Sequence, residues 1–160
     1  MKFALAIITA FAGTVAAAGF PLYFTLVGNG GQTVLTDGEN LYVGSGTSDD
    51  RETAIFTGSN RTGLIQYLVP GAVSTAVQDL YIVENSVKPV ALSSPHSAEF
   101  PKGASYLNFS VTADGYLDHN SEQLFVVDGY GDAKERAIYW LGAHGSTYRA
   151  ESLYVKENEQ

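Results

Sequence analysis

The sequence predicts an all-β protein, and three observations lead to this prediction. Turn signals recur at close spacing along the chain, short runs rich in Val, Ile, Leu, Tyr and Phe lie between them, and helix signals are poor. We expect a compact antiparallel β-barrel or β-sandwich of about ten to twelve short strands.

The individual elements follow from glycine-centred turns and the runs between them. Glycine and asparagine accept the backbone conformations that tight turns require, whereas β-branched and aromatic residues favour strands. The clearest strand-like runs are residues 22–27, 64–69, 80–83, 124–127 and 137–141. The turn signals are Gly28-Asn29-Gly30-Gly31, Asp37-Gly38, Gly44-Ser45-Gly46, Pro70-Gly71, Asp114-Gly115 and Asp128-Gly129.

Two segments, residues 71–79 and 132–136, are the only helix candidates, each of a turn or two. A faint repeat offers an alternative fold, because the triplets Leu41-Tyr42-Val43, Leu80-Tyr81-Ile82 and Leu124-Phe125-Val126 recur at spacings of 39 and 44 residues. A threefold repeat of that period would indicate a β-trefoil-like barrel. Since any all-β chain yields several such triplets, the trefoil stands as the alternative.

The first eighteen residues resemble a secretory signal peptide. Lys2 is their only charge, residues 3–15 are apolar, and Ala16-Ala17-Ala18 supplies the small side chains that signal peptidase accepts. The apolar run is too short for a membrane-spanning helix. We therefore expect residues 1–18 to be removed before Gly19, leaving residues 19–160 as a single secreted β domain without a transmembrane segment.

The composition of the expected mature chain narrows the classes of function. Removing eighteen of the 160 residues leaves 142, of which eight are Lys or Arg and seventeen are Asp or Glu, a net charge of −9. No Lys/Arg cluster stands out in the sequence, so nucleic acid is excluded as a partner. The chain has no cysteine, which excludes disulfides, thiol catalysis and Cys-type zinc sites.

Two N-glycosylation sequons accord with secretion. Asn60-Arg61-Thr62 lies in a Gly- and Ser-rich stretch that we interpret as an exposed loop. Asn108-Phe109-Ser110 lies inside an apparent strand, residues 106–111, where Asn108 faces solvent if the polar residues alternate outward. We predict glycosylation at Asn60 and Asn108, although a chance occurrence explains the second sequon nearly as well.

No catalytic or metal-binding pattern emerges from the sequence. His96 lies close to serines in Ser93-Ser94-Pro95-His96-Ser97, but no Gly-x-Ser-x-Gly motif accompanies it. The other histidines, His119 and His144, are too scattered for a zinc motif. We predict no catalytic residue, cofactor or metal site, and keep a hydrolase that pairs His96 with a distant carboxylate as an alternative.

Loop aromatics are the remaining candidates for function. Tyr130, in Asp128-Gly129-Tyr130-Gly131-Asp132, and Tyr148 lie beside glycine or polar residues and are candidate ligand contacts, because exposed aromatic rings can pack against sugars. The carboxylates of the same Gly-rich segment could hold calcium, but they lack the ligand order of an EF-hand, so we interpret the segment as a surface turn. Trp140 is expected in the core.

A stretch in the middle of the chain resembles a family of secreted fungal proteins. Gln78-Asp79-Leu80-Tyr81-Ile82-Val83 is followed by Ser94-Pro95-His96-Ser97-Ala98-Glu99-Phe100-Pro101-Lys102-Gly103-Ala104. This order is similar to a block in IgE-binding proteins and relatives of the cell-wall protein PhiA, as is the earlier Asp37-Gly38-Glu39-Asn40-Leu41-Tyr42-Val43. Many relatives carry an alanine-cysteine-proline where Val126-Val127-Asp128 stands here. The resemblance implies a non-enzymatic extracellular or wall-associated β-protein.

Together these observations lead us to expect a secreted fungal protein of the cell wall or extracellular matrix. It would act by binding, with cell-wall polysaccharide or a host surface component as its partner. An effector or elicitor of plant hypersensitive cell death and defence is the alternative, since both need only a stable exported fold. The oligomeric state is left open by the sequence.

Overall fold

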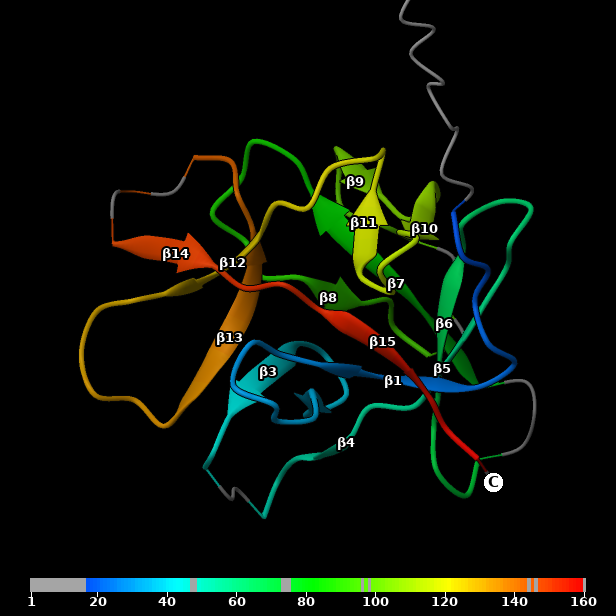
Figure 1. The fold of residues 1–160 in the computed structure, drawn as a ribbon, viewed down its shortest axis with the longest axis horizontal. Coiled ribbons are helices and arrows are strands. Elements are labelled where there is room, and N and C mark those ends of the chain that lie inside the picture. The colour runs from blue at the N-terminus through cyan, green and yellow to red at the C-terminus, as the bar shows by residue number, and fades with distance from the viewer. Residues whose placement is uncertain are drawn as a thin grey trace, which may run out of the picture.

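The computed structural model describes residues 17–46, 49–72, 76–95, 97, 99–143, 145 and 147–159, and these form strands, turns and loops without a helix (Figure 1). Fifteen strands lie in the described residues, more than the ten to twelve predicted because several span only two residues. They are β1 (Phe24–Val27), β2 (Leu35–Thr36), β3 (Leu41–Gly44), β4 (Glu52–Thr53), β5 (Phe56–Gly58), β6 (Ile65–Leu68), β7 (Val77–Val83), β8 (Ala91–Leu92), β9 (Ala104–Ser105), β10 (Phe109–Val111), β11 (Leu117–His119), β12 (Phe125–Asp128), β13 (Glu135–Trp140), β14 (Tyr148–Ala150) and β15 (Tyr154–Glu157).

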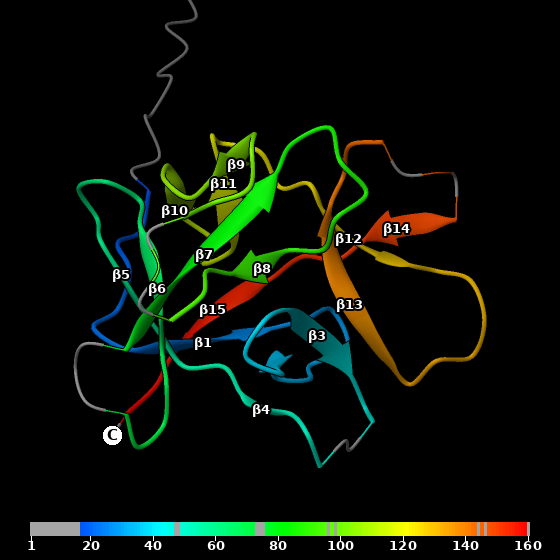
Figure 2. The same cartoon turned by 180° about the vertical axis from the view of Figure 1, so that it is seen from behind.

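Two large antiparallel sheets organise the strands. One has the order β15-β1-β5-β6-β7-β8, with β9 also paired to β7, and the other has the order β14-β12-β13-β3-β2-β4. The hairpin of β10 and β11 stands apart from both. In Figures 1 and 2 the second sheet ends on the side where β13 and β14 lie, away from β5 and β6. The β13–β14 end of the second sheet therefore lies apart from the β5–β6 end of the first sheet.

One hydrophobic core joins both sheets. Phe24 and Phe56 of the first sheet and Ile138 of the second are completely buried, and all belong to the same apolar cluster. Burying a side chain of this size contributes about 1.5–3 kcal/mol, so a shared core of such residues holds the sheets together. Trp140 is 5% exposed, which confirms its predicted place in the core.

Alternation of side chains explains why these segments become strands. In β3, Leu41 and Val43 are buried while Tyr42 between them is partly exposed, and β6 follows the same pattern. Successive side chains of a strand point to opposite faces, so this alternation sets one apolar face against the core. The five strand-like runs predicted from sequence all contain strands.

The helix predictions for residues 71–79 and 132–136 were wrong where the structure describes them. Residues 77–79 begin β7, whose residues pair with β6 from Gln66↔Asp79 to Leu68↔Val77. Residues 135–136 begin β13, which pairs with β3. In both segments the hydrogen bonds of a neighbouring strand outweigh a weak local helix preference.

The all-β prediction is confirmed, and the described strands close no barrel. Of the three repeated triplets, Leu41-Tyr42-Val43 lies in β3 and Leu80-Tyr81-Ile82 in β7, whereas Leu124 immediately precedes β12. β3 and β12 belong to one sheet and β7 to the other.

The expected signal peptide falls almost entirely outside the described residues, which begin at Ala17. Ala18 forms an antiparallel bridge with Val111 at the edge of β10. Among the described residues no helix is long and apolar enough to cross a membrane. The removal of residues 1–18 stays a prediction.

Candidate functional site

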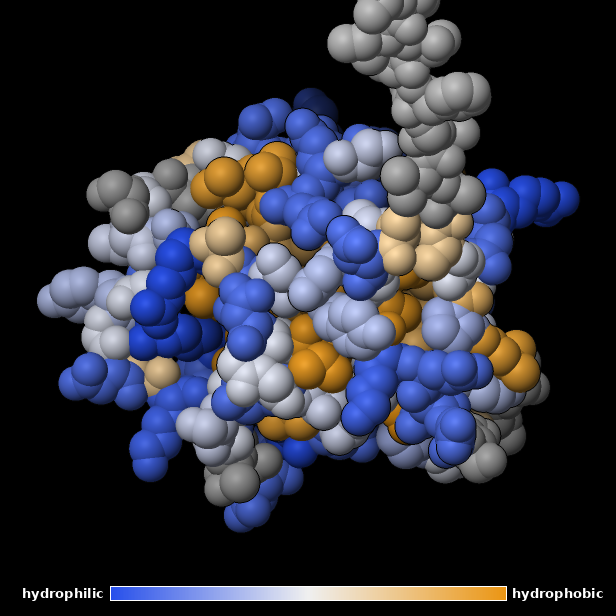
Figure 3. Space-filling view, viewed as in Figure 1, coloured by the Kyte–Doolittle hydropathy of each residue, from blue (hydrophilic) through white to orange (hydrophobic). Residues whose placement is uncertain are grey.

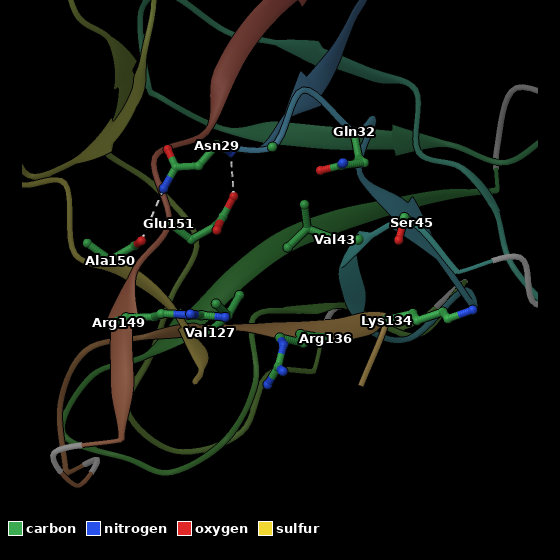
Figure 4. A pocket seen from close by; sticks show the side chains of 12 residues that line it. Asn29, Gln32, Val43, Ser45, Val127, Lys134, Arg136, Arg149, Ala150 and Glu151 are labelled. Atoms are coloured by element: carbon green, nitrogen blue, oxygen red, sulfur yellow. Dashed lines mark hydrogen bonds between the residues drawn. The ribbon is translucent and has the colours of Figure 1, made fainter. Parts of the chain in front are cut away.

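An open pocket of about 370 Å³ lies at the β13–β14 end of the second sheet (Figure 4). We call it the cationic pocket, because Lys134, Arg136 and Arg149 line it together with one acidic residue, Glu151. Its remaining lining is mostly polar or glycine, with Asn29, Gln32 and Ser45 among the side chains. The surface view also shows strongly hydrophilic side chains over β12, β13 and β14 (Figure 3).

Strand pairing brings the cations together. Arg136 of β13 pairs with Val43 of β3, and Arg149 of β14 pairs with Val127 of β12. Because paired residues of antiparallel strands point to the same face, both guanidinium groups stand on the face that carries these two valines. That face is buried further along β13, at Ile138 and Trp140, so the pocket is the point where the core face opens to solvent.

Two glycines let the chain approach closely enough to shape the pocket. Gly44 has a φ of 141°, and a Cβ atom there would overlap the carbonyl oxygen of Lys134, which accepts a hydrogen bond from the N–H of Ser45 at 3.0 Å. At Gly28, a Cβ atom would overlap the carboxylate of Glu151. Neither position can take a larger side chain without a shift of the pocket wall.

Glu151 holds one wall of the pocket in place. It is 8% exposed, and its Oε1 accepts a hydrogen bond of 2.6 Å from the backbone N–H of Asn29. The Asn29 side chain donates to the Ala150 carbonyl at 3.1 Å (Figure 4). It also accepts a hydrogen bond from the Ser152 N–H at 3.2 Å, and we call these contacts of Asn29 with residues 150–152 the clamp. This clamp ties the loop after β1 to the segment after β14.

The three cations differ in what they already bind. Arg136 donates to the carbonyl oxygens of Asp128, Tyr130 and Gly131, with the last two bonds at 2.9 and 2.6 Å. It therefore holds the loop after β12 in place. Lys134 and Arg149 are exposed, and within the described residues neither side chain forms a hydrogen bond or an ion pair. Their donors are available to a ligand.

Both candidate ligand contacts lie at this end of the molecule. Tyr130 is 79% exposed in the loop that Arg136 holds, and Tyr148 of β14 pairs with Asp128 of β12. The Tyr148 ring meets the edge of Tyr139, with centroids 5.2 Å apart, and partial desolvation followed by the nearby Tyr139 and Asp128 raises its pKa. Since Tyr148 precedes Arg149 in the strand, its side chain points to the face opposite the cationic pocket.

The cationic pocket was missed by the sequence analysis, which found no Lys/Arg cluster. Lys134 and Arg136 are two residues apart, but Arg149 joins them only through the register of β12 with β13 and with β14. The pair Lys134-x-Arg136 at the start of β13 was the usable signal, but residues 132–136 were predicted as a helix candidate, so the pair was not recognised.

The two sequons lie on the surface, in different settings. Asn60 is exposed, its Oδ1 accepts a 2.6 Å hydrogen bond from the N–H of Phe20, and its Nδ2 lies 3.1 Å from the position of a Cβ at Gly19. Asn108 is exposed as well, but it precedes β10 with a φ of 64° and does not lie inside a strand as predicted. Glycosylation at either residue stays a prediction.

A second polar cluster surrounds His119, at the opposite end of β13. His119 is completely buried against Phe109 and Trp140, and its Nε2 lies 2.8 Å from Ser105 Oγ. Its Nδ1 lies 3.9 Å from Glu84 Oε1, beyond hydrogen-bond reach, and 3.4 Å from Asn120 Nδ2. Burial is the main cause that lowers the pKa of His119, so its ring is neutral at neutral pH.

The His119 cluster has the residue types of a serine nucleophile and its base, of which Ser105 is partly exposed and His119 is completely buried. A nucleophile must meet its substrate, and neither Ser105 nor His119 lines the cationic pocket or any of four further pockets on the described residues. His96 and His144 lie outside the described residues. Among the residues that the structure describes, no group of three metal-ligating side chains is assembled.

Comparisons with known proteins add no relative to this picture. No protein-family model, curated protein or solved structure matches the chain. The resemblance to PhiA-like proteins therefore stays a prediction, and a functional proposal has to be argued from the site itself.

Proposed function

We propose that this chain is a secreted, non-enzymatic protein of the cell wall or extracellular matrix that binds polysaccharide at the cationic pocket. One observation carries the proposal: the pocket is open and polar, with a volume of about 370 Å³, and its Arg136 binds the backbone carbonyl of Tyr130, a residue that is 79% exposed. Pockets of this size suit small ligands or short segments of a longer one.

The chemistry of a sugar matches both parts of this site. Sugar rings have apolar C–H faces, which pack against aromatic rings, and hydroxyl groups, which exchange hydrogen bonds with polar side chains. Tyr130 offers the ring, while Gln32, Ser45 and Lys134 offer donors and acceptors along the pocket. Arg136 ties the backbone of Tyr130 to the pocket, since it donates a hydrogen bond to the carbonyl oxygen of that residue.

Co-sedimentation with insoluble polymers tests this proposal. The purified protein, residues 19–160, is mixed with chitin, β-glucan, mannan and calcium-gelled polygalacturonate, and the bound fraction is measured. We expect retention on at least one polymer and a several-fold weaker retention of Tyr130→Ala. Tyr154→Ala is the matched control, because Tyr154 is 44% exposed on β15 and does not line the cationic pocket. Recovery of all the protein in the supernatant with every polymer would refute the proposal.

A second candidate function, ester hydrolysis, has one observation in its favour, the 2.8 Å contact of Ser105 Oγ with His119 Nε2. We expect no reaction of Ser105 with a fluorophosphonate probe, because His119 is completely buried. Stoichiometric labelling that disappears in Ser105→Ala would instead establish a hydrolase, and intact-protein mass spectrometry reads out both results.

A further inference from the structure

We infer that the cationic pocket selects acidic polysaccharides, whose sugars carry carboxylate groups. This inference rests on the proposed function, because it names the class of polysaccharide that the same pocket would bind. It follows from the charges that line the pocket, from the unused donors of Arg149 and from the acidity of the whole chain.

The pocket concentrates positive charge in a protein that has little of it. The chain has nine Lys and Arg against seventeen Asp and Glu, yet three of the nine cations line one pocket. Arg51 shows the usual alternative, since it pairs with Glu135 and stacks on the ring of Tyr42. Lys134, Arg136 and Arg149 form no ion pair with any described residue. A bound anion would relieve their mutual repulsion.

The one acid in the pocket does not neutralise these cations. Glu151 is 8% exposed, and its Oε1 accepts a hydrogen bond from the backbone N–H of Asn29. Its carboxylate forms no ion pair with Arg136 or Arg149, although all three line the same pocket. Glu151 thus shapes the wall and leaves the guanidinium groups to an outside partner.

Arg149 is the side chain suited to bind a carboxylate. A guanidinium group presents its N–H donors in a planar fork that matches the two oxygens of a carboxylate. None of these donors forms a hydrogen bond within the described part of the chain, whereas Arg136 already serves three backbone carbonyls. Arg149 would therefore bind the ligand directly, with Lys134 and Arg136 adding positive potential.

The acidity of the rest of the surface favours a sparsely charged polymer. Duplex DNA carries about one negative charge per ~1.7 Å of axis, and a chain of net charge −8 repels such a density. A polyuronate carries one carboxylate on each sugar and presents uncharged hydroxyls and C–H faces between them. It can place a carboxylate in the pocket and a sugar ring against Tyr130 without a second dense charge meeting the acidic surface.

Two forms of one polymer give the sharpest test. Polygalacturonate and fully methyl-esterified polygalacturonate share a backbone and differ in whether the carboxylates are masked. Binding of the protein to both is measured by biolayer interferometry in 20 and 200 mM NaCl. We expect polygalacturonate to bind at least tenfold more tightly than the ester at the lower salt concentration, and this preference to shrink at the higher one.

Two variants that each remove one positive charge, one inside the pocket and one outside it, distinguish binding at the pocket from a general effect of charge. Arg149→Gln should lose the tenfold preference, and Arg149→Lys should keep part of it, because the charge remains but the fork is lost. Lys156→Gln removes one charge from exposed β15 and should retain the preference in full. Unchanged thermal unfolding of each variant establishes that the fold is intact.

The outcomes distinguish this inference from the proposed function. Equal binding to both polymers would overturn the acidic selectivity and leave polysaccharide binding standing, whereas binding to neither form nor to the insoluble polymers would refute the proposed function itself. Dextran sulfate is the third ligand. If it binds as tightly as polygalacturonate and with the same loss in Arg149→Gln, the pocket takes any anion and the carboxylate assignment is wrong.

Discussion

The two ends of β13 place polar groups in opposite situations. At one end Trp140 packs on His119, whose ring is completely buried and bonded to Ser105. At the other end, on the same face, Arg136 opens into the cationic pocket beside the unpaired Arg149. We call the His119 end of β13 the closed end, because its polar groups bond to one another. We call the Arg136 end the open end, because Arg149 there is exposed and its donors have no partner among the described residues. The two ends thus differ in how far their polar groups are exposed to solvent, and residue type alone does not reveal this difference.

Removal of Trp140 should have the largest effect, since it destroys the closed end. Trp140→Ala takes away a large buried ring that contacts Phe125 and His119 at centroid distances of 5.1 and 5.3 Å. We expect a loss of about 3–5 kcal/mol in the free energy of unfolding, measured by urea denaturation. Tyr130→Ala, at the open end, should change it by less than about 0.5 kcal/mol. Equal losses in the two variants would contradict the distinction between the ends.

Gly44→Ala tests how far the wall of the cationic pocket can shift. Its positive φ alone should cost about 1–3 kcal/mol, and overlap with the Lys134 carbonyl should add to this cost. Gly31→Ala is the matched control, because Gly31 has a φ of 78° and open space around its Cβ position. Urea denaturation of both variants separates backbone strain from the overlap. A smaller loss in Gly44→Ala than in Gly31→Ala would show that the pocket wall yields easily.

The closed end should make stability depend on pH through His119. Burial lowers the pKa of His119 from its ordinary value of 6.5, so the unfolded chain binds a proton more readily than the folded one. The free energy of unfolding should therefore keep its full value above about pH 6.5 and decrease as the pH falls below that value. Glu84, Asp118 and Glu122 oppose the shift, which makes the effect smaller than that of a core substitution.

Urea denaturation at pH 7.5 and 5.5 measures this dependence. His119→Gln, which keeps a polar group beside Ser105, should show a smaller decline between the two pH values than the unmodified protein. The same decline in both proteins would assign the pH dependence to other groups.

Arg149→Gln should have the smallest effect on stability, within about 0.5 kcal/mol, because the side chain is exposed and forms no bond within the described residues. Urea denaturation measures this change. If Arg149→Gln destabilised the protein by more than about 1 kcal/mol, its side chain would belong to the structure, and the open end would resemble the closed one.

Much of the fold was accessible from sequence because strand signals are local. Runs of aliphatic and aromatic residues between turn signals placed β6 and β13, and the aliphatic and aromatic neighbours of Trp140 placed it in the core. The helix predictions failed where pairing with a distant strand decides the structure, as it does for residues 77–79 against β6.

The candidate site was harder to predict from sequence, because the register between paired strands brings its residues together. Tyr130 and Tyr148 lie at the same end of the molecule as the cationic pocket, yet the pocket itself is lined by Arg149, one residue beyond Tyr148 and on the opposite face. The approach of Ser105 to His119 likewise depends on how β9 and β11 come together, and no short motif encodes it.

The clamp between Asn29 and Glu151 joins residues 122 positions apart in the chain. Its neighbour in the fold, the pairing of β1 with β15, spans a similar separation. A nascent chain that has not yet emerged as far as β14 possesses neither Arg149 nor the acid that orders the loop after β1. The cationic pocket is consequently among the last features to form during synthesis.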